Sequence, residues 1–342
     1  MQPASEIDTE GRELAQLVAD FPGFRIWRED VCGRVRYIAL SQHPDLRPHT
    51  VITADLAELR EALARGQRVP GWPQPTFSPA APSVARIYDH VLGGKDHFPA
   101  DRAAARELLE RFPEVAQIAR ANRAFLARAV RHVARQQVTQ FVDLGAGLPA
   151  SPNVHETTRQ VIPGARVAYV DNDPMVLAHA RAVLAVDDQV AVVAGDLRAP
   201  AAVLADPALI SLIDFSKPVC VVLASVLHFL PAQQADAAVA AFREQMSPGS
   251  YLVISVGTSS GTDPELIRCL QATYAGTAPV TARTEAEITS WFDGLLLARP
   301  GLTDVWAWRA GQSRQAHRPP QSRARFVVGV ARKPSGPGPW RP

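Results

Sequence analysis

The stretch DLGAGLPA, residues 143–150, places an acid and two glycines where an apolar run ends. The run from Phe141 to Leu144 has the composition of a buried strand, and Gly145 and Gly147 follow it directly. Glycines after a strand let the backbone approach a ligand closely, because no Cβ intervenes. The stretch therefore predicts a ligand-binding turn.

The turn satisfies the dinucleotide fingerprint G-x-G-x-x-[GA], and Asp171 follows near the spacing of a ribose-binding acid. Two residues argue against NAD. Asp143 would repel a pyrophosphate, and Pro149 stands where the phosphate-binding helix should begin. The Asp143 carboxylate would instead attract the sulfonium and ammonium groups of S-adenosylmethionine. We expect a cationic ligand without phosphate, and an NAD-dependent oxidoreductase is the less favoured alternative.

Three later apolar runs also end in candidate site residues, and these are Asp171, Asn172, Asp196, Leu197, Ser225 and His228. In an open α/β sheet, ligands bind outside the carboxyl ends of the strands, so these residues should meet at one site. Asp171 could accept hydrogen bonds from both ribose hydroxyls, and Asp196 could accept from the adenine amino group. Each could instead cap the helix that follows it.

With the opening segment RIYDHVLGGKDHF at residues 86–98, the sequence resembles class I S-adenosylmethionine-dependent methyltransferases. Within them it is most similar to a bacterial S-adenosyl methyltransferase-like family of mostly unassigned substrate. The resemblance covers roughly residues 83–331. It implies an α/β fold: a Rossmann-like, seven-stranded, mostly parallel sheet with a reversed last strand and helices on both faces.

The resemblance also implies S-adenosyl-L-methionine as the cofactor. By position it puts Asp143, Gly145 and Gly147 at the methionine end of the cofactor and Asp171 on the ribose. Asp196 and Leu197 would lie around the adenine. His90 and His97 stand where the family more often has Tyr and Asn.

The opening segment and His228 can each be interpreted in more than one way. The opening segment is either a lid, with Tyr88, Gly93 and Gly94 contacting the cofactor, or a rigid connector whose glycine pair ends a helix. His228 is a catalytic base, a residue lining the cofactor or acceptor pocket, or a hydrogen-bonded core residue. A base is needed only if the nucleophile starts protonated.

From residue 140 the chain alternates strand-like and helix-like patterns, which is typical of a parallel sheet covered on both faces. The predicted strands are Gln140–Leu144, Arg166–Val170, Val190–Ala194, Val219–Ala224 and Tyr251–Ser255, and the helices between them include Pro174–Leu184, Pro200–Leu212 and Ala232–Gln245. Val305–Trp308 and Arg325–Val330 are expected to form a closing antiparallel pair.

The chain is expected to have four parts. Residues 1–68 form a small α+β unit of open role, read as strand (24–28), strand (35–39) and helix (55–64). Residues 69–82 form a proline-rich linker, residues 83–332 the methyltransferase domain, and residues 333–342 a tail too rich in proline and glycine to fold.

The composition of the chain argues against several kinds of binding partner. A net charge of +2 gives no reason to expect nucleic acid or an anionic membrane. The three cysteines and nine histidines show no metal-ligand spacing, and no signal peptide or apolar membrane span is evident. We expect a cytoplasmic methyltransferase acting on a small molecule, with oligomeric state open. An S-adenosylmethionine-binding sensor or partner protein without catalytic activity is the alternative.

Overall fold

The computed structural model of the chain describes residues 4–31, 34–42, 50–66, 78–185, 187–309 and 322–335. The turn expected at residues 32–33, most of the linker and the end of the tail lie outside these ranges. The chain divides into two compact units. One contains residues 1–78 and 173–186, and the other contains residues 79–172 and 187–342.

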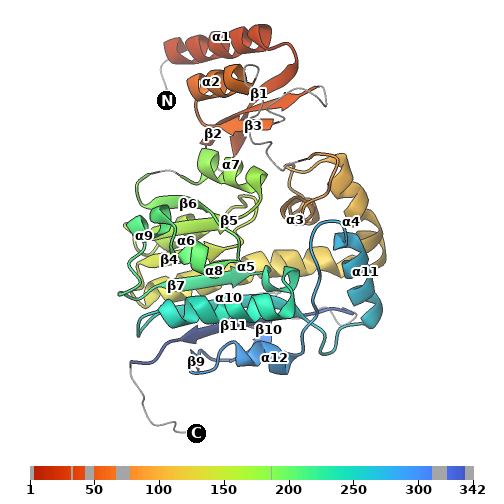
Figure 1. Cartoon of the computed structure of the whole chain (residues 1–342), viewed down its shortest axis with the longest axis vertical. Helices are drawn as coiled ribbons and strands as arrows, with labels where there is room; N and C mark the ends of the chain where they lie inside the picture. Colours follow the sequence, from red (N-terminus) through yellow and green to blue (C-terminus); the bar gives the residue numbers. More distant parts are fainter. Residues whose placement is uncertain are drawn as a thin grey trace. The chain divides into compact units, whose positions relative to one another are not determined.

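The smaller unit contains an antiparallel sheet of order β1-β2-β3 and three helices (Figure 1). Its strands are β1 (Phe24–Val31), β2 (Arg34–Ser41) and β3 (Thr50–Thr53), and its helices are α1 (Ala4–Asp20), α2 (Leu56–Gly66) and α7 (Pro174–Val183). Leu17 of α1 and Leu59 of α2 pack on Phe24 and Tyr37 of the sheet. Ile38 has the opposite parity on its strand, so it faces the other side of the sheet. The sheet therefore has buried side chains on both faces. Helix α7 contacts β2 and β3.

The sequence predicted only two strands and one helix in this unit. It missed α1, although Leu14 and Leu17 of that helix face the core, and β3, whose four residues are too few to show a period. The predicted helix at residues 55–64 corresponds to α2. The small unit also includes α7, a helix that the alternating pattern had placed with the larger sheet.

The larger unit is built on a sheet of order β10-β11-β8-β7-β4-β5-β6, with the short β9 paired to β11. Its strands are β4 (Gln140–Leu144), β5 (Arg166–Asp171), β6 (Val190–Ala194), β7 (Cys220–Ala224), β8 (Tyr251–Thr258), β9 (Leu296–Leu297), β10 (Thr303–Asp304) and β11 (Arg325–Arg332). Strands β4 to β8 are parallel, and β11 runs antiparallel to β8. The predicted Rossmann-like sheet with a reversed last strand is confirmed.

The predicted strand at Val305–Trp308 is wrong, because these residues form turns. The alternation of apolar and other residues in this stretch reflects the packing of side chains, not the hydrogen bonding of a strand. Trp308 is fully buried, with its ring edge-on to Phe125 at 5.5 Å. Arg128 donates hydrogen bonds to the carbonyls of Val305 and Trp308, which fixes the turn. The two residues before this turn, Thr303 and Asp304, form β10 and pair with β11.

Helices cover both faces of the larger sheet. They are α3 (Val84–Leu92), α4 (Pro99–Arg111), α5 (Glu114–Arg135), α6 (Val154–Arg159), α8 (Pro200–Leu204), α9 (Pro207–Leu212), α10 (Ala232–Gln245), α11 (Pro264–Tyr274) and α12 (Glu285–Ser290). In Figure 1, α10 lies in front of the sheet and α5 behind it. The predicted helix 200–212 is split in two, because Asp206 caps a new helix by accepting from the Ala208 amide at 2.8 Å.

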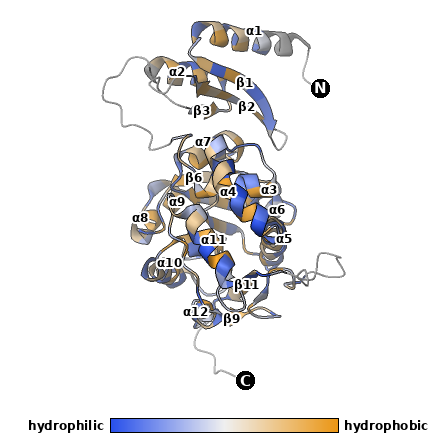
Figure 2. Ribbon diagram, turned by 90° about the vertical axis from the view of Figure 1, so that its right-hand side faces the viewer, coloured by the Kyte–Doolittle hydropathy of each residue, from blue (hydrophilic) through white to orange (hydrophobic). Residues whose placement is uncertain are grey.

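Helices α3, α4, α5 and α11 contact one another beside the sheet, and Figure 2 shows the hydrophilic outer face of α4. Ile87 and Val91 of α3 pack with Ala105, Ala119 and Tyr274 of the other three helices. These helices therefore form a layer with a core of its own. Within the described ranges, every helix is too short or too polar to cross a lipid bilayer.

Asp101 ties this layer together. Its buried carboxylate accepts from the backbone amides of Ser83 and Phe98, at 2.9 and 2.7 Å, and from the Arg86 guanidinium at 2.9 Å. Arg86 is also almost fully buried. The pair thus holds the start of α3 against the start of α4, across the whole opening segment.

We predict that Asp101→Leu lowers the free energy of unfolding by about 3–5 kcal/mol, because it removes the carboxylate that pairs with a buried guanidinium. Urea denaturation measures the change. The double variant Arg86→Met/Asp101→Leu should be more stable than Asp101→Leu alone, since no buried charge is then left without its carboxylate. Lys217→Ala, which breaks an exposed ion pair, is the control and should barely move the midpoint. A double variant that is less stable than Asp101→Leu would contradict this account.

Candidate active site

The glycine turn after β4 has the backbone that a close approach requires. Gly145 and Gly147 have φ values of 70° and 66°, a region that other residues rarely adopt. A Cβ on Gly145 would lie 2.4 Å from Cγ2 of Val226, whereas a Cβ on Gly147 would meet nothing within 4 Å. Gly145 is therefore needed for packing as well as for conformation, and the space beside Gly147 is open to a ligand.

Asp171 lies beside this turn. One of its carboxylate oxygens accepts a hydrogen bond from the Gly147 amide at 2.9 Å. The helix-capping role that Asp171 could have played belongs to Asp173, which accepts from the Met175 amide at 2.8 Å. The structure thus brings the predicted ribose acid and the predicted glycine turn together.

Asp143 is buried under the turn, with 5% of its surface exposed. Burial raises the pKa of its carboxyl to about 7, Arg123 opposes the shift, and the nearby Asp171 adds to it. Within the described part of the chain, no hydrogen bond reaches this carboxylate. A buried carboxylate without a donor is costly, and a cation beside it would remove much of that cost. The site therefore suits a ligand that carries positive charge.

Asp196, which follows β6, already has hydrogen-bond partners within the protein. Asp196 accepts from the side chain of Asn172 at 3.2 Å and from Nε of Arg198 at 2.9 Å. Arg198 lowers the pKa of the Asp196 carboxyl to about 2. Leu197 is buried in the main hydrophobic core. An adenine amino group at Asp196 would have to share the carboxylate with Arg198.

The glycine pair of the opening segment ends helix α3. Gly93 has a φ of 84° and caps the helix, and the Gly94 amide donates to the carbonyl of Asp89 at 2.9 Å. The Asp89 carboxylate accepts from the Asp96 amide at 2.9 Å and contacts the ring of His97 at 3.0 Å. The glycine pair therefore ends α3, as the connector interpretation expects, and the lid stays a prediction. Tyr88 and Val91, earlier in the same segment, line the cavity beside the site.

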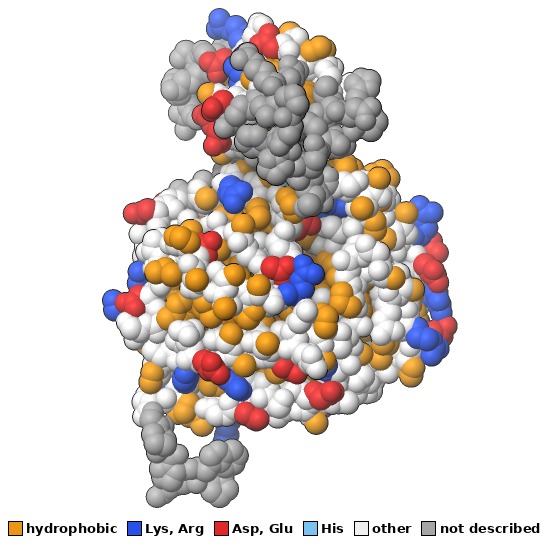
Figure 3. Space-filling view, viewed as in Figure 1, with side chains coloured by type: hydrophobic (Ala, Val, Ile, Leu, Met, Phe, Trp, Pro, Cys, Tyr) orange, Lys and Arg blue, Asp and Glu red, His pale blue; other side chains and the backbone are white. Residues whose placement is uncertain are grey.

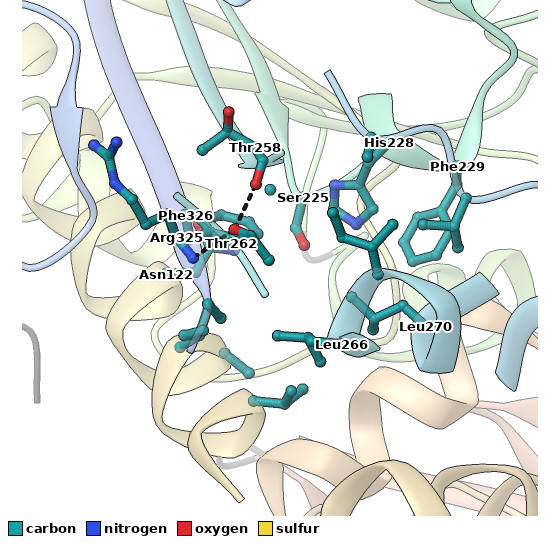
Figure 4. A pocket seen from close by; sticks show the side chains of 18 of the residues that line it. Asn122, Ser225, His228, Phe229, Thr258, Thr262, Leu266, Leu270, Arg325 and Phe326 are labelled. Carbon is teal, nitrogen blue, oxygen red and sulfur yellow. Dashed lines mark hydrogen bonds between the residues drawn. The ribbon is translucent and has the colours of Figure 1, made fainter. Parts of the chain in front are cut away.

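A cavity of about 120 Å³ lies beyond the end of β7 (Figure 4). Its walls come from α3, α5, α11 and the ends of β7, β8 and β11, and they are mostly apolar. Among the residues that line it are Tyr88, Ile118, Asn122, Ser225, His228, Leu270 and Phe326. Val226, which packs on Gly145, lies between Ser225 and His228, so one segment borders both the glycine turn and the cavity.

His228 is held rigidly at this cavity. Its carbonyl accepts from the Thr281 amide at 2.8 Å, and Arg283 donates to the preceding carbonyl of Leu227 at 3.2 Å. The ring packs on Phe229 and Phe326. Burial, with a smaller effect of Arg283, lowers the pKa of His228 to about 4, so the ring is neutral at neutral pH. Its Nδ1 is buried and has no hydrogen-bond partner.

Sequence reasoning missed two neighbours on α5. Asn122 lines the cavity, and Arg123 lowers the pKa of Asp143 while donating to the Pro152 carbonyl at 3.0 Å. Asn122 could have been found, because it interrupts an apolar stripe that includes Ile118 and Phe125 at helical spacing. Nothing in the sequence distinguishes Arg123 from the other arginines of that helix.

The larger unit offers no extended patch of one charge on the described part of the face drawn in Figure 3, where basic and acidic side chains are interspersed. Among the described residues, no three His, Cys, Asp or Glu side chains are grouped as metal ligands.

A family model described as S-adenosyl methyltransferase matches residues 70–334. The chain belongs to this S-adenosyl methyltransferase family. S-adenosyl-L-methionine is therefore its cofactor, and the NAD alternative is set aside. The buried, donor-free carboxylate of Asp143 and the open space beside Gly147 fit that cofactor.

Two solved structures are similar to this methyltransferase. A proposed methyltransferase from Thermobifida fusca YX is 38% identical, with a TM-score of 0.71, over 78% of this chain and 100% of the other. A DUF574 family protein from Streptomyces avermitilis MA-4680 is 35% identical, with a TM-score of 0.69, over 74% of this chain and 98% of the other. A search of curated proteins found no significant match.

We predict that the affinity for the cofactor decreases as the pH is lowered through the pKa of Asp143. That pKa is raised to about 7, so the carboxylate is lost as the pH drops below 7, and a cationic ligand then loses its counter-charge. The Kd of S-adenosylmethionine, measured by calorimetry, should rise roughly tenfold between pH 8 and pH 6. Methylthioadenosine lacks both positive charges and is the control, with a flat profile. Asp143→Asn should flatten the S-adenosylmethionine profile, and a flat profile in the unmodified enzyme would exclude Asp143 as the counter-charge.

We also predict that Asp171→Ala weakens S-adenosylmethionine binding by at least about tenfold, since charge-assisted hydrogen bonds to the ribose would be lost. The Gly147 amide would lose its acceptor as well. The protein should stay folded, as circular dichroism can verify. Asp187→Ala removes an exposed carboxylate distant in sequence and is the matched control. Unchanged affinity in a folded Asp171→Ala variant would rule out the ribose contact.

Proposed function

We propose that this methyltransferase transfers a methyl group by direct displacement to a small molecule bound in the cavity beyond β7. One observation carries the proposal. The segment from Ser225 to His228 lines the cavity, and its Val226 packs against Gly145 of the glycine turn. A cofactor at the turn and an acceptor in the cavity would therefore be neighbours.

In this proposal, Asp143, Gly145 and Gly147 hold the methionine end of the cofactor, and Arg123 lies near enough to pair with its carboxylate. Asp171 binds the ribose, and Asn172, Asp196 and Leu197 border the adenine. The sulfonium supplies a methyl group that is already electrophilic. The protein mainly has to align the acceptor and keep water away.

His228 is proposed to take the proton that the acceptor loses. Its Nδ1 is covered by protein while the ring lines the cavity, so Nε2 is the nitrogen offered to the acceptor. A pKa near 4 makes the ring a weak base, but it keeps the ring unprotonated and able to accept. A hydroxyl, or the N–H group of an amide or aromatic ring, becomes strongly acidic as it gains a methyl group, so a weak base is sufficient.

The alternative is a family member that binds the cofactor without turnover and acts as a sensor or partner protein. The family and the fold are compatible with either role. The cavity favours catalysis, because a sensor of the cofactor alone has no use for an apolar chamber next to the methyl group.

Labelled S-adenosylmethionine distinguishes these functions. Incubated with a cell extract and the enzyme, it should place label in the small-molecule fraction. His228→Gln should lower kcat about a hundredfold without changing the Kd of S-adenosylhomocysteine. His132→Gln, a change remote from the cavity, is the control. Label in protein or nucleic acid would contradict a small-molecule acceptor, and absence of label from every fraction would favour the sensor.

A further inference from the structure

Asn122 is a polar residue in the mostly apolar wall of the cavity. It lies on the buried face of α5, with 2% of its surface exposed, and it lines the cavity among apolar side chains (Figure 4). Its amide nitrogen donates to the Tyr88 hydroxyl at 3.1 Å. Its carbonyl oxygen, Oδ1, is buried without a hydrogen-bond partner. Native proteins rarely leave a buried polar atom unpaired, so this one requires an explanation.

The direction of the amide is fixed by Tyr88. The Tyr88 hydroxyl donates its single proton to the carbonyl of Ala119 at 3.3 Å. Burial raises the pKa of this phenol, so the proton stays in place at neutral pH. The hydroxyl oxygen must therefore accept from Asn122, which places the amide nitrogen toward Tyr88. The group left without a partner is an acceptor, not a donor.

Two hydroxyls of the lining, those of Thr258 and Thr262, do have hydrogen-bond partners. Thr258 donates to the Arg283 carbonyl at 2.8 Å, and Thr262 donates to the Thr258 carbonyl at 2.5 Å. The Thr262 oxygen also accepts from the Arg325 amide at 2.9 Å. These two hydroxyls are therefore hydrogen-bonded within the protein and do not require a ligand as a partner.

The lining also lacks a partner for a charged ligand. Arg325 is the charged side chain among the described lining residues, and its guanidinium is paired with Glu285 and donates to the Ser260 carbonyl at 3.3 Å. His228 is neutral. A charged acceptor would lose its hydration here without gaining a counter-charge, which is strongly unfavourable.

We propose that the methyl acceptor is an uncharged, mainly apolar molecule with an N–H or O–H group that donates to Oδ1 of Asn122. Asn122 is then the residue that selects for the donor, and Tyr88 is a positioning residue that keeps the carbonyl toward it. This inference rests on the proposed function, because it takes the cavity as the acceptor site. Oδ1 is covered in the structure, so a shift of lining side chains accompanies binding, as is common at ligand sites.

Two probes of almost equal shape test this. Indole has an N–H donor, and benzofuran has an oxygen in its place. On the enzyme saturated with S-adenosylhomocysteine, calorimetric titration should give indole a Kd roughly tenfold lower than that of benzofuran. Benzoate and benzylamine, one anionic and one cationic, should not bind measurably.

Asn122→Leu should remove the preference for indole while leaving the Kd of S-adenosylhomocysteine unchanged, which also shows that the variant is folded. Tyr88→Phe provides an independent variant. It frees the amide to turn its nitrogen toward the cavity, so benzofuran should gain affinity relative to indole.

Equal binding of indole and benzofuran to the unmodified enzyme would overturn the role of Asn122, as would a preference that survives Asn122→Leu. Binding of benzoate or benzylamine would overturn the claim of an uncharged acceptor. If neither indole nor benzofuran binds while S-adenosylhomocysteine does, the cavity is not an acceptor site. That outcome refutes the proposed function, and it differs from failure of the donor selection alone.

Discussion

The backbone of Gly145 lies against the side chain of Val226, so closely that even a methyl group on the glycine would reach Cγ2 at 2.4 Å. This approach joins the end of β4 to the segment after β7. It is possible because β4 occupies the middle of the sheet and pairs with β5 on one side and β7 on the other. Ligands in such sheets bind where the strand order reverses, and here the reversal lies between these strands.

Everything proposed for the enzyme follows from that junction. On one side lie Asp143, Gly147 and Asp171, a hydrogen-bonded turn with an unbonded carboxylate beneath it. On the other side lies the apolar cavity, with His228 and Asn122 in its wall. A bulkier residue at position 145 would push the two apart, and methyl transfer depends on holding the two reactants in contact.

Burial sets the pKa of two groups at the site, whereas an ion pair sets the pKa of a third. Asp143 and Asp196 end neighbouring regions of the same sheet edge, yet the pKa of the first is about 7 and that of the second about 2. Asp143 is buried without a donor, whereas Asp196 is partly exposed and bonded to Arg198. Loss of water keeps His228 neutral, and it also raises the pKa of Asp143. The buried Asp143 carboxylate thus favours positive charge beside it, and the charged side chain described in the cavity lining, Arg325, is already paired.

The sequence alone determined the parallel strands, the glycine turn and its acids, because strand periodicity and a turn motif are encoded by residues adjacent in the chain. Residues 140–144 and 190–194 were placed to the residue, and Asp171 came to lie beside Gly147 as the spacing indicated. The same local reasoning failed where distant contacts decide. Val305–Trp308 alternates like a strand, but the packing of Trp308 on Phe125 makes it a turn. Helix α7 carries the pattern of a crossover helix, yet it packs on the small sheet.

Only the tertiary structure decided the chemistry of the cavity. Whether His228 is a base, a lining residue or a core residue depends on what surrounds it, and Thr281, Arg283 and Phe326 are far from it in the chain. The unpaired oxygen of Asn122 likewise exists because Tyr88 takes the nitrogen of the amide. Residue types and spacing predict which groups are available. Desolvation and hydrogen-bond pairing, which set their charge and direction, arise only when remote segments pack together.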